Sequence, residues 1–111
     1  WRPGKGQRAG MIGSLLLGIP DGDLLLYVGR VGTGFSDRDL VEIAQRLHPL
    51  AAANSHFQEI PEIDAHTARW VRPALVGEVE FAEWTAAGRL RHPTWRGWRP
   101  DKSPAEVVPE S

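Results

Sequence analysis

The 111-residue chain contains no cysteine, which excludes disulfide bonds and thiolate-bound metal sites and agrees with a reducing compartment. No apolar run approaches the ~20 residues that a membrane-spanning helix needs, and the basic beginning is not followed by the apolar core of a signal peptide. The hydrophobic fraction of 41% and the net charge of −1 are ordinary for a small globular domain. We therefore expect one small cytoplasmic domain with no membrane partner.

Groups that could carry catalysis are also scarce. The serines lack the sequence context of a nucleophile, and the four histidines do not have the spacing of metal ligands. Glu78 and Glu80 fall on one face of a predicted strand, where a solvated face explains them, and with Glu83 they form no convincing acid–base pair. The sequence predicts neither a metal site nor an independent enzyme.

Charge is distributed unevenly along the chain. Residues 1–18 carry a net charge of +3, residues 19–88 carry −6, and residues 89–102 carry +4 through four arginines and a lysine against one acid. Guanidinium groups suit polyphosphate oxygens because they offer paired N–H donors and keep their charge. An acidic middle between two basic ends favours a polyanionic partner. For residues 1–18, solvated surface charge is the alternative.

The hydrophobic pattern predicts a mostly β domain. Residues 11–19 and 24–31 form two apolar segments joined by a turn at Asp21-Gly22, which is typical of a hairpin. Residues 75–82 alternate as a half-buried strand does, and residues 90–98 predict another strand. Residues 51–69 show no clear period and are predicted to be a loop.

One main helix is predicted between these strands. Ser36 is a favourable N-cap, and Leu40, Ile43 and Leu47 repeat at helical spacing until Pro49 ends the helix. Four or five strands with one helix between them is the element order of a small, partly open β-barrel.

Two features allow both a structural and a functional interpretation. Trp95 and Trp98 could stack on bases or sugars, although tryptophans in a small barrel more often lie in its core. Gly32-Thr33-Gly34 predicts a connection from strand to helix, whose backbone N–H groups could also approach a phosphate. The remaining tryptophans are assigned to packing: Trp1, Trp70 and Trp84.

Four segments in the same order resemble the C-terminal OB-fold domain of ATP-dependent DNA ligases. Residues 91–102 (Arg-x-Pro-x-Trp-x-x-x-Arg-x-Asp-Lys) resemble nucleotidyltransferase motif VI, and residues 29–37 (GRVGTGFSD) resemble the loop and helix start of that domain. Residues 70–79 match a further family segment. Residues 83–93 (EWTAAGRLRHP) are especially similar to the bacterial end-joining ligase, ligase D, and its stand-alone relatives.

The resemblance implies a five-stranded, partly open Greek-key barrel with one main helix over residues 1–102, followed by a proline-containing tail, 103–111. Neither Lys5 nor Lys102 lies in the Lys-x-Asp-Gly motif that holds the family's nucleophile, so the isolated domain should be inactive. It should be monomeric and partner the nucleotidyltransferase domain of the same polypeptide. ATP and Mg²⁺ would serve the full-length enzyme, with neither bound stably by this domain alone.

The resemblance also implies that the domain acts in two orientations, one during adenylation and one on DNA. During lysine adenylation, Arg99 and Lys102, with Arg91 and Arg96 as further candidates, would hold the β- and γ-phosphates of ATP, and Asp101 would orient neighbouring cations. The domain would then swing onto nicked duplex DNA at the nucleoid during double-strand break repair. Such DNA contacts are largely independent of sequence and weakened by salt. The candidates for them are Lys5, Arg8, Arg30, Gly32, Thr33 and Gly34.

Two other interpretations are open at this point. One is a free-standing OB module that binds single-stranded nucleic acid through Trp95 and Trp98. The other is the OB domain of an RNA ligase or a capping enzyme. The motif VI resemblance favours a nucleotidyltransferase over the first, and residues 83–93 favour a DNA ligase over the second. Whether polymerase or nuclease domains belong to the parent protein is open too.

Overall fold

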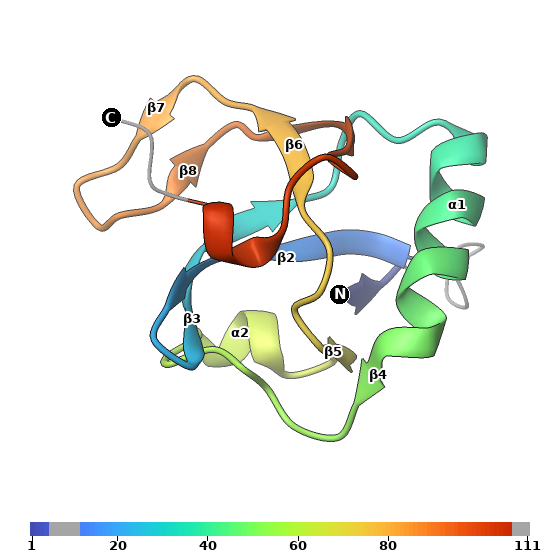
Figure 1. The fold of residues 1–111 in the computed structure, drawn as a ribbon. Coiled ribbons are helices and arrows are strands. Elements are labelled where there is room, and N and C mark those ends of the chain that lie inside the picture. The colour runs from blue at the N-terminus through green and yellow to red at the C-terminus, as the bar shows by residue number, and fades with distance from the viewer. Residues whose placement is uncertain (5–11, 108–111) are drawn as a thin grey trace.

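A long antiparallel hairpin forms the centre of the structure, a computed structural model that describes residues 1–4 and 12–107 (Figure 1). The hairpin consists of β2 (Ile12–Asp21) and β3 (Leu24–Val31), and β1 (Arg2–Pro3) pairs with the outer edge of β2. The turn lies at Asp21-Gly22-Asp23, where Gly22 has a φ of +64°. The hairpin predicted from the sequence is therefore confirmed.

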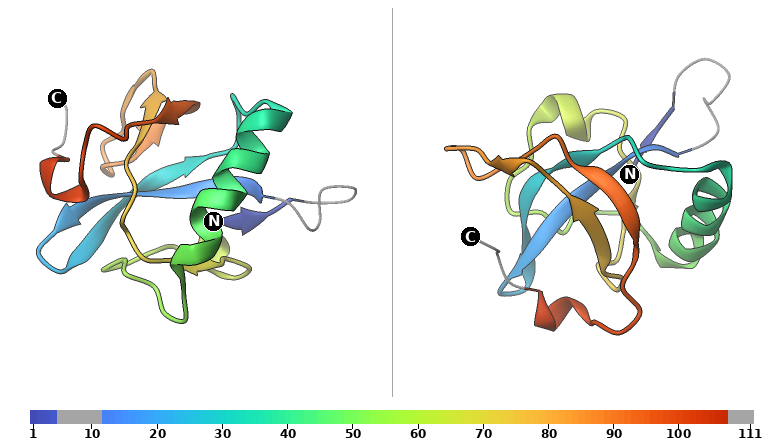
Figure 2. Two further views of the ribbon diagram at one scale, coloured as in Figure 1. Left: turned by 45° about the vertical axis from the view of Figure 1, so that its right-hand side comes forward. Right: turned by 90° about the horizontal axis from the view of Figure 1, so that it is seen from above.

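The other strands are short and pair over long distances in the chain. They are β4 (Ala51–Ala52) with β5 (Trp70–Val71), β6 (Gly77–Glu80) with β9 (Thr94–Trp98), and β7 (Glu83–Trp84) with β8 (Leu90–Arg91). The left view in Figure 2 shows the chain between β5 and β6 crossing the β2–β3 hairpin, and the right view shows the main helix to one side of it. The mostly β class with one main helix is confirmed, and the strands of the described residues form open sheets.

The main helix, α1 (Asp37–Leu47), begins where the sequence predicts. The Ser36 hydroxyl accepts a hydrogen bond from the Asp39 N–H at 3.0 Å, and the Asp39 carboxylate accepts one from the Ser36 N–H at 2.9 Å. These reciprocal bonds form a capping box. Leu40, Ile43 and Leu47 are buried on one face of α1, and a 3₁₀ turn (His48–Leu50) containing Pro49 follows it.

The core lies between the hairpin, α1 and β9. Its buried members include Trp95 of β9, which is only 4% exposed, and Trp98 packs against it with the ring centroids 4.9 Å apart. Trp95 and Trp98 are three residues apart, and a bulge in β9 lets both side chains face inward. In the strand ladder Val79 lies opposite Trp95 and Glu78 lies opposite Gly97, so Arg96 is an extra residue with none opposite it on β6. Gly97 has a φ of +140°. The buried Trp95 cannot serve as a stacking platform, and Trp98 is half-buried against it, which disfavours the single-strand-binding interpretation.

Two sequence predictions are wrong in detail. Residues 90–98 are not one strand, because His92 takes a φ of +55° and separates β8 from β9. Residues 51–69 are not featureless, since they contain β4 and the short helix α2 (Glu62–Ala65). After β9 the chain returns to β2, against which a second 3₁₀ turn (Pro104–Glu106) packs with Ser103 and Glu106 forming its cap.

Candidate phosphate-binding site

The turn that follows β9 brings two predicted phosphate-binding residues together. The Lys102 N–H donates to the Arg99 carbonyl at 3.1 Å, and the Arg99 N–H donates to the Val76 carbonyl at 2.7 Å. These bonds fix the turn against the chain just before β6. Arg99 and Lys102 are therefore neighbours on one exposed turn.

Two carboxylates hold the Arg99 guanidinium in place. Its Nε and Nη2 donate to the two oxygens of Asp101 at 3.0 and 2.9 Å, and its Nη1 donates to Glu78 Oε1 at 3.2 Å. A guanidinium has five N–H donors, so one N–H on each terminal nitrogen is left over. The side chain is 35% exposed, and the group faces solvent at the edge of the β6–β9 pair. It is oriented by the acids without being turned into the interior.

The Arg99–Asp101 pair is charged throughout the neutral pH range. Hydrogen bonds from Arg99 lower the pKa of Asp101 to about 2, and the same bonds raise the pKa of Arg99. Asp101 thus accepts two hydrogen bonds from the Arg99 guanidinium, and its role in orienting that cation for phosphate stays a prediction. With Glu78 and Lys102 added, the turn contains two positive and two negative charges and is close to neutral overall.

The other two arginines of the predicted set lie elsewhere. Arg91 on β8 pairs with Glu83 on β7 at 3.1 Å, and Arg96, at the bulge of β9, pairs with Glu80 on β6 at 3.7 Å. Both side chains are more than half exposed. The five residues of β9 span about 16 Å. Arg91 and Arg99 therefore flank opposite ends of this strand.

The predicted DNA-binding residues lie around the connection from β3 to α1. Gly32, Thr33 and Gly34 are exposed, and the Thr33 carbonyl accepts a hydrogen bond from the Trp95 N–H at 2.9 Å, which ties the connection to β9. Arg30 precedes it on β3 with its side chain 50% exposed. Lys5 and Arg8 lie outside the described residues.

Sequence reasoning missed Asp64 on α2. This aspartate is buried, and it accepts hydrogen bonds from Tyr27 Oη at 2.9 Å and from Arg30 Nη1 at 3.0 Å. Burial, followed by the hydrogen bond to Asp64, raises the pKa of Tyr27. A helix of four residues is too short to show a hydrophobic period, so α2 could not be predicted. The one sequence feature that could have indicated burial of Asp64 is its position between the apolar residues Ile63 and Ala65.

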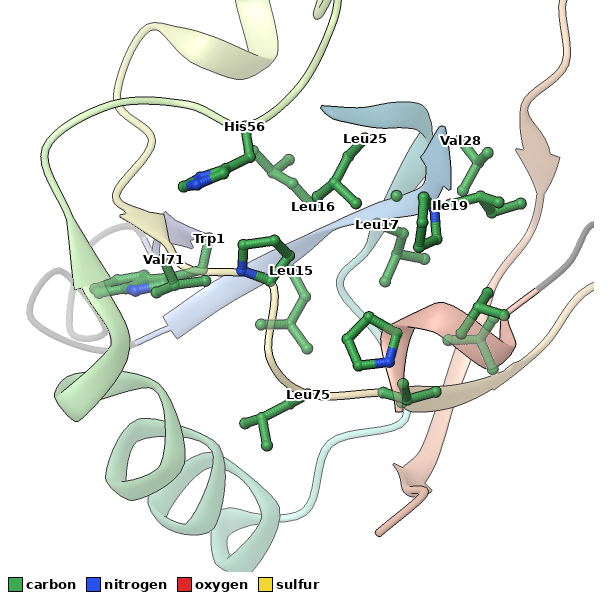
Figure 3. Close-up of a pocket in the computed structure, with 18 of the residues that line it drawn as sticks. Trp1, Leu15, Leu16, Leu17, Ile19, Leu25, Val28, His56, Val71 and Leu75 are labelled. Carbon is green, nitrogen blue, oxygen red and sulfur yellow. The ribbon is translucent and has the colours of Figure 1, made fainter. Parts of the chain in front are cut away.

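A pocket of about 360 Å³, partly open to solvent, lies between the hairpin and the chain that returns over it (Figure 3). Figure 3 shows Leu15, Leu17 and Ile19 of β2 on one side of this space and Leu75 on another. Its walls are mainly apolar, whereas Arg99 and Lys102 contribute to its lining from the turn after β9.

Comparison with protein families resolves the class of the chain. The family model described as "ATP dependent DNA ligase C terminal region" matches residues 8–102. The chain belongs to this family. The resemblance stated from the sequence is confirmed, and an OB domain of a DNA ligase is favoured over that of an RNA ligase or a capping enzyme.

LigD proteins and the structure of a LigD ligase domain are similar to this chain over nearly its whole length. It is 51% identical over 109 residues to the multifunctional non-homologous end joining protein LigD of Mycolicibacterium smegmatis, covering 97% of the chain and 14% of that protein. The LigD protein of Pseudomonas aeruginosa is 39% identical, with 96% and 13% covered. The crystal structure of the ligase domain from M. tuberculosis LigD superposes with a TM-score of 0.93 at 50% identity, covering 99% of this chain and 36% of that one.

The chain therefore spans about one seventh of the length of the LigD relatives. A mycobacterial DNA ligase D complexed with ATP and MES also matches, with a TM-score of 0.83 at 52% identity over 88% of this chain and 33% of that one. Over residues 1–4 and 12–107, no helix is long and apolar enough to cross a membrane, and no group of three side chains could hold a metal ion.

Proposed function

We propose that this ligase domain orients the pyrophosphate of ATP while the nucleotidyltransferase domain of the same polypeptide adenylates its own lysine. The supporting observation is the Arg99–Lys102 turn. It carries two cationic residues joined by a backbone hydrogen bond, and Asp101 and Glu78 fix the plane of the Arg99 guanidinium while leaving some of its N–H donors unused. An oriented guanidinium with free donors suits the oxygens of a polyphosphate.

In the proposed step, the lysine amine attacks the α-phosphorus of ATP, and the bond from that phosphorus to the bridging oxygen breaks. Negative charge then develops on the departing pyrophosphate. Arg99 and Lys102 would bind its β- and γ-phosphate oxygens, which keeps the leaving group in line with the attacking amine and neutralises its charge. Mg²⁺ bound with the nucleotide in the other domain would supply further neutralisation. Arg91 and Arg96 would serve as outer contacts, because they lie along β8 and β9 away from this turn.

The near-neutral charge of the turn suits an interaction that must be reversible. Two acids offset the two cations, so the turn has little long-range attraction for an anion. ATP would bind here only after the nucleotidyltransferase domain has placed its phosphates next to Arg99. For the same reason we propose that the isolated domain does not bind ATP stably. We also propose that it does not bind Mg²⁺ stably, and that it is monomeric and inactive without the nucleotidyltransferase domain.

After adenylation, we propose that the domain clamps nicked duplex DNA with a second surface. Arg30 and the exposed connection Gly32-Thr33-Gly34 would contact the phosphate backbone and the minor groove, together with Lys5 and Arg8. The LigD relatives are non-homologous end joining proteins, so we propose that the parent ligase works in double-strand break repair, in the cytoplasm at the nucleoid.

The adenylation role is tested in the ligase that contains this domain. Arg99→Ala and Lys102→Ala should each slow formation of the lysine adenylate by about 100-fold, which is typical of losing one donor to a developing charge. Arg38→Ala is the matched control, since Arg38 is an exposed arginine on α1 that forms no ion pair among the described residues. Adenylation rates in the Arg99 and Lys102 variants equal to that of the control would refute the proposal.

A further inference from the structure

A single carboxylate on α2 holds side chains from two different strands. Asp64 accepts hydrogen bonds from Tyr27 and Arg30 of β3, one on each of its oxygens, at 2.9 and 3.0 Å. Arg2 of β1 completes the group with its Nη1 3.8 Å from Asp64 Oδ1. We refer to these four residues as the Asp64 cluster.

The backbone of β3 is shaped to bring Tyr27 and Arg30 to the same acid. Residues three apart on a regular strand point to opposite faces of the sheet. Here Tyr27 pairs with Gly18 and Gly29 pairs with Leu17, so Val28 is an extra residue in the ladder. Gly29 has a φ of +135°, which a residue with a side chain rarely adopts. This bulge turns Tyr27 and Arg30 toward one side, where α2 lies.

Arg2 reaches the same side through the register of the sheet. Arg2 pairs with Ser14 on β2, and Arg30 pairs with Leu16 two residues further along that strand. Residues opposite each other or two apart share a face of the sheet. The two guanidiniums therefore lie on one face, beside a single acid.

The Asp64 cluster and the neighbouring Arg89 together are positively charged and partly open to solvent. Arg89 adds a third cation, because its guanidinium lies 4.8 Å from the centre of the Tyr27 ring and donates to the Tyr27 carbonyl at 3.1 Å. Three cations against one carboxylate give a local charge of +2. Asp64 itself is buried, whereas the Arg30 side chain is half exposed and uses only one of its N–H groups on the acid.

We propose that Asp64 is a positioning residue that holds Arg30, with Arg2 beside it, in the orientation that binds a phosphate of duplex DNA. This inference rests on the DNA-binding role proposed for Arg30. An arginine side chain has considerable rotamer entropy, and fixing it before the ligand arrives lowers the loss on binding. The buried carboxylate fixes one edge of the guanidinium and leaves the remaining donors for the phosphate.

Simple electrostatics predicts the opposite sign, which makes the inference testable. If Asp64 only reduced the positive charge of the surface, its removal would strengthen binding to DNA. If Asp64 positions Arg30, its removal weakens binding although the surface becomes more positive. Asp64→Asn is the appropriate change because it keeps the shape of the side chain and removes the charge.

The experiment measures binding of nicked duplex DNA by the ligase that contains this domain, over a series of salt concentrations. Glu62→Gln is the matched control, because Glu62 is an exposed acid on the same helix with no ion pair among the described residues. Asp64→Asn should weaken binding about fivefold and reduce the salt slope by about 0.9, the value of one phosphate contact. Glu62→Gln should bind DNA as the unsubstituted ligase does. Binding by Asp64→Asn that is equal to or tighter than the control would overturn the inference.

Two further measurements separate positioning from a general loss of structure. Asp64→Asn in an Arg30→Ala background should cause no additional loss, whereas independent losses that add would contradict the coupling. Lysine adenylation uses the Arg99 turn, so its rate should change less than twofold in Asp64→Asn; a parallel fall in adenylation and DNA binding would mean that Asp64 only stabilises the domain. If Arg30→Ala itself leaves DNA binding unchanged, the DNA role of Arg30 fails as well.

A second variant applies if Asp64→Asn does not fold. Tyr27→Phe keeps the buried ring and removes only the hydroxyl that donates to Asp64 Oδ2. With that restraint lost, binding of nicked duplex should weaken about twofold, and the loss should disappear in the Arg30→Ala background. A loss that persists in this background would overturn the inference.

Discussion

Replacement of Gly34 by alanine should destabilise the domain strongly, because two separate conditions at this position require glycine. Gly34 has a φ of +90°, where a residue with a Cβ atom is strained by about 1–2 kcal/mol. A Cβ atom would also lie 2.7 Å from the Trp95 carbonyl oxygen and 2.8 Å from its nitrogen. Backbone cannot rotate away as a flexible side chain can, so this contact adds about 1–3 kcal/mol. We expect a total loss of about 2–5 kcal/mol in the free energy of unfolding.

Gly88→Ala provides a matched control for this prediction. Gly88 has a φ of +76°, but a Cβ atom there would meet no other atom within 4 Å. Its substitution should therefore cost only the backbone strain, about 1–2 kcal/mol. Urea unfolding of the domain measures both values. Equal losses in the two variants would refute the close approach of the β3–α1 connection to β9.

Three further predictions concern stability and ionisation. Ser36→Ala should reduce the free energy of unfolding by about 1 kcal/mol through loss of the N-cap, measured by urea unfolding; an unchanged midpoint would contradict the capping box. Ile43→Ala should cost about 2–5 kcal/mol, whereas Val41→Ala on the exposed side of α1 should cost less than about 1 kcal/mol, and similar losses would contradict the assigned face. The Asp101 carboxylate should titrate by NMR near pH 2 and return toward ~3.9 in Arg99→Ala. Because the folded domain depresses the pKa of Asp101, the Arg99–Asp101 pair contributes its full stabilisation above about pH 4. This contribution is lost as the pH falls through about 2.

Sequence reasoning succeeded where the signal is local. The cap at Ser36 and the face of α1 depend on residues three or four positions apart, and the pattern specifies them directly. The β2–β3 hairpin is specified by its turn and by two apolar segments. The break between β8 and β9 was missed because it depends on a positive φ at His92, a residue type that gives no such signal.

The site was predictable in its residues but less so in its arrangement. The grouping of Arg99 with Asp101 and Lys102 follows from their closeness in the chain. The bond from Arg99 to Glu78 depends on how β6 and β9 pair around a bulge, and the separation of Arg91 from Arg99 depends on where β9 begins and ends. Asp64 reaches Tyr27 and Arg30 across more than thirty residues of chain, so no short-range pattern could have indicated it.

The most direct test of the central claim compares two rates in one preparation of the Arg99→Ala ligase. The first is the single-turnover rate of lysine adenylation with ATP, and the second is the rate of sealing a nick that already carries the adenylate. If Arg99 orients pyrophosphate, the first rate falls by about 100-fold and the second stays close to that of the unsubstituted ligase. An equal fall in both rates would contradict the claim.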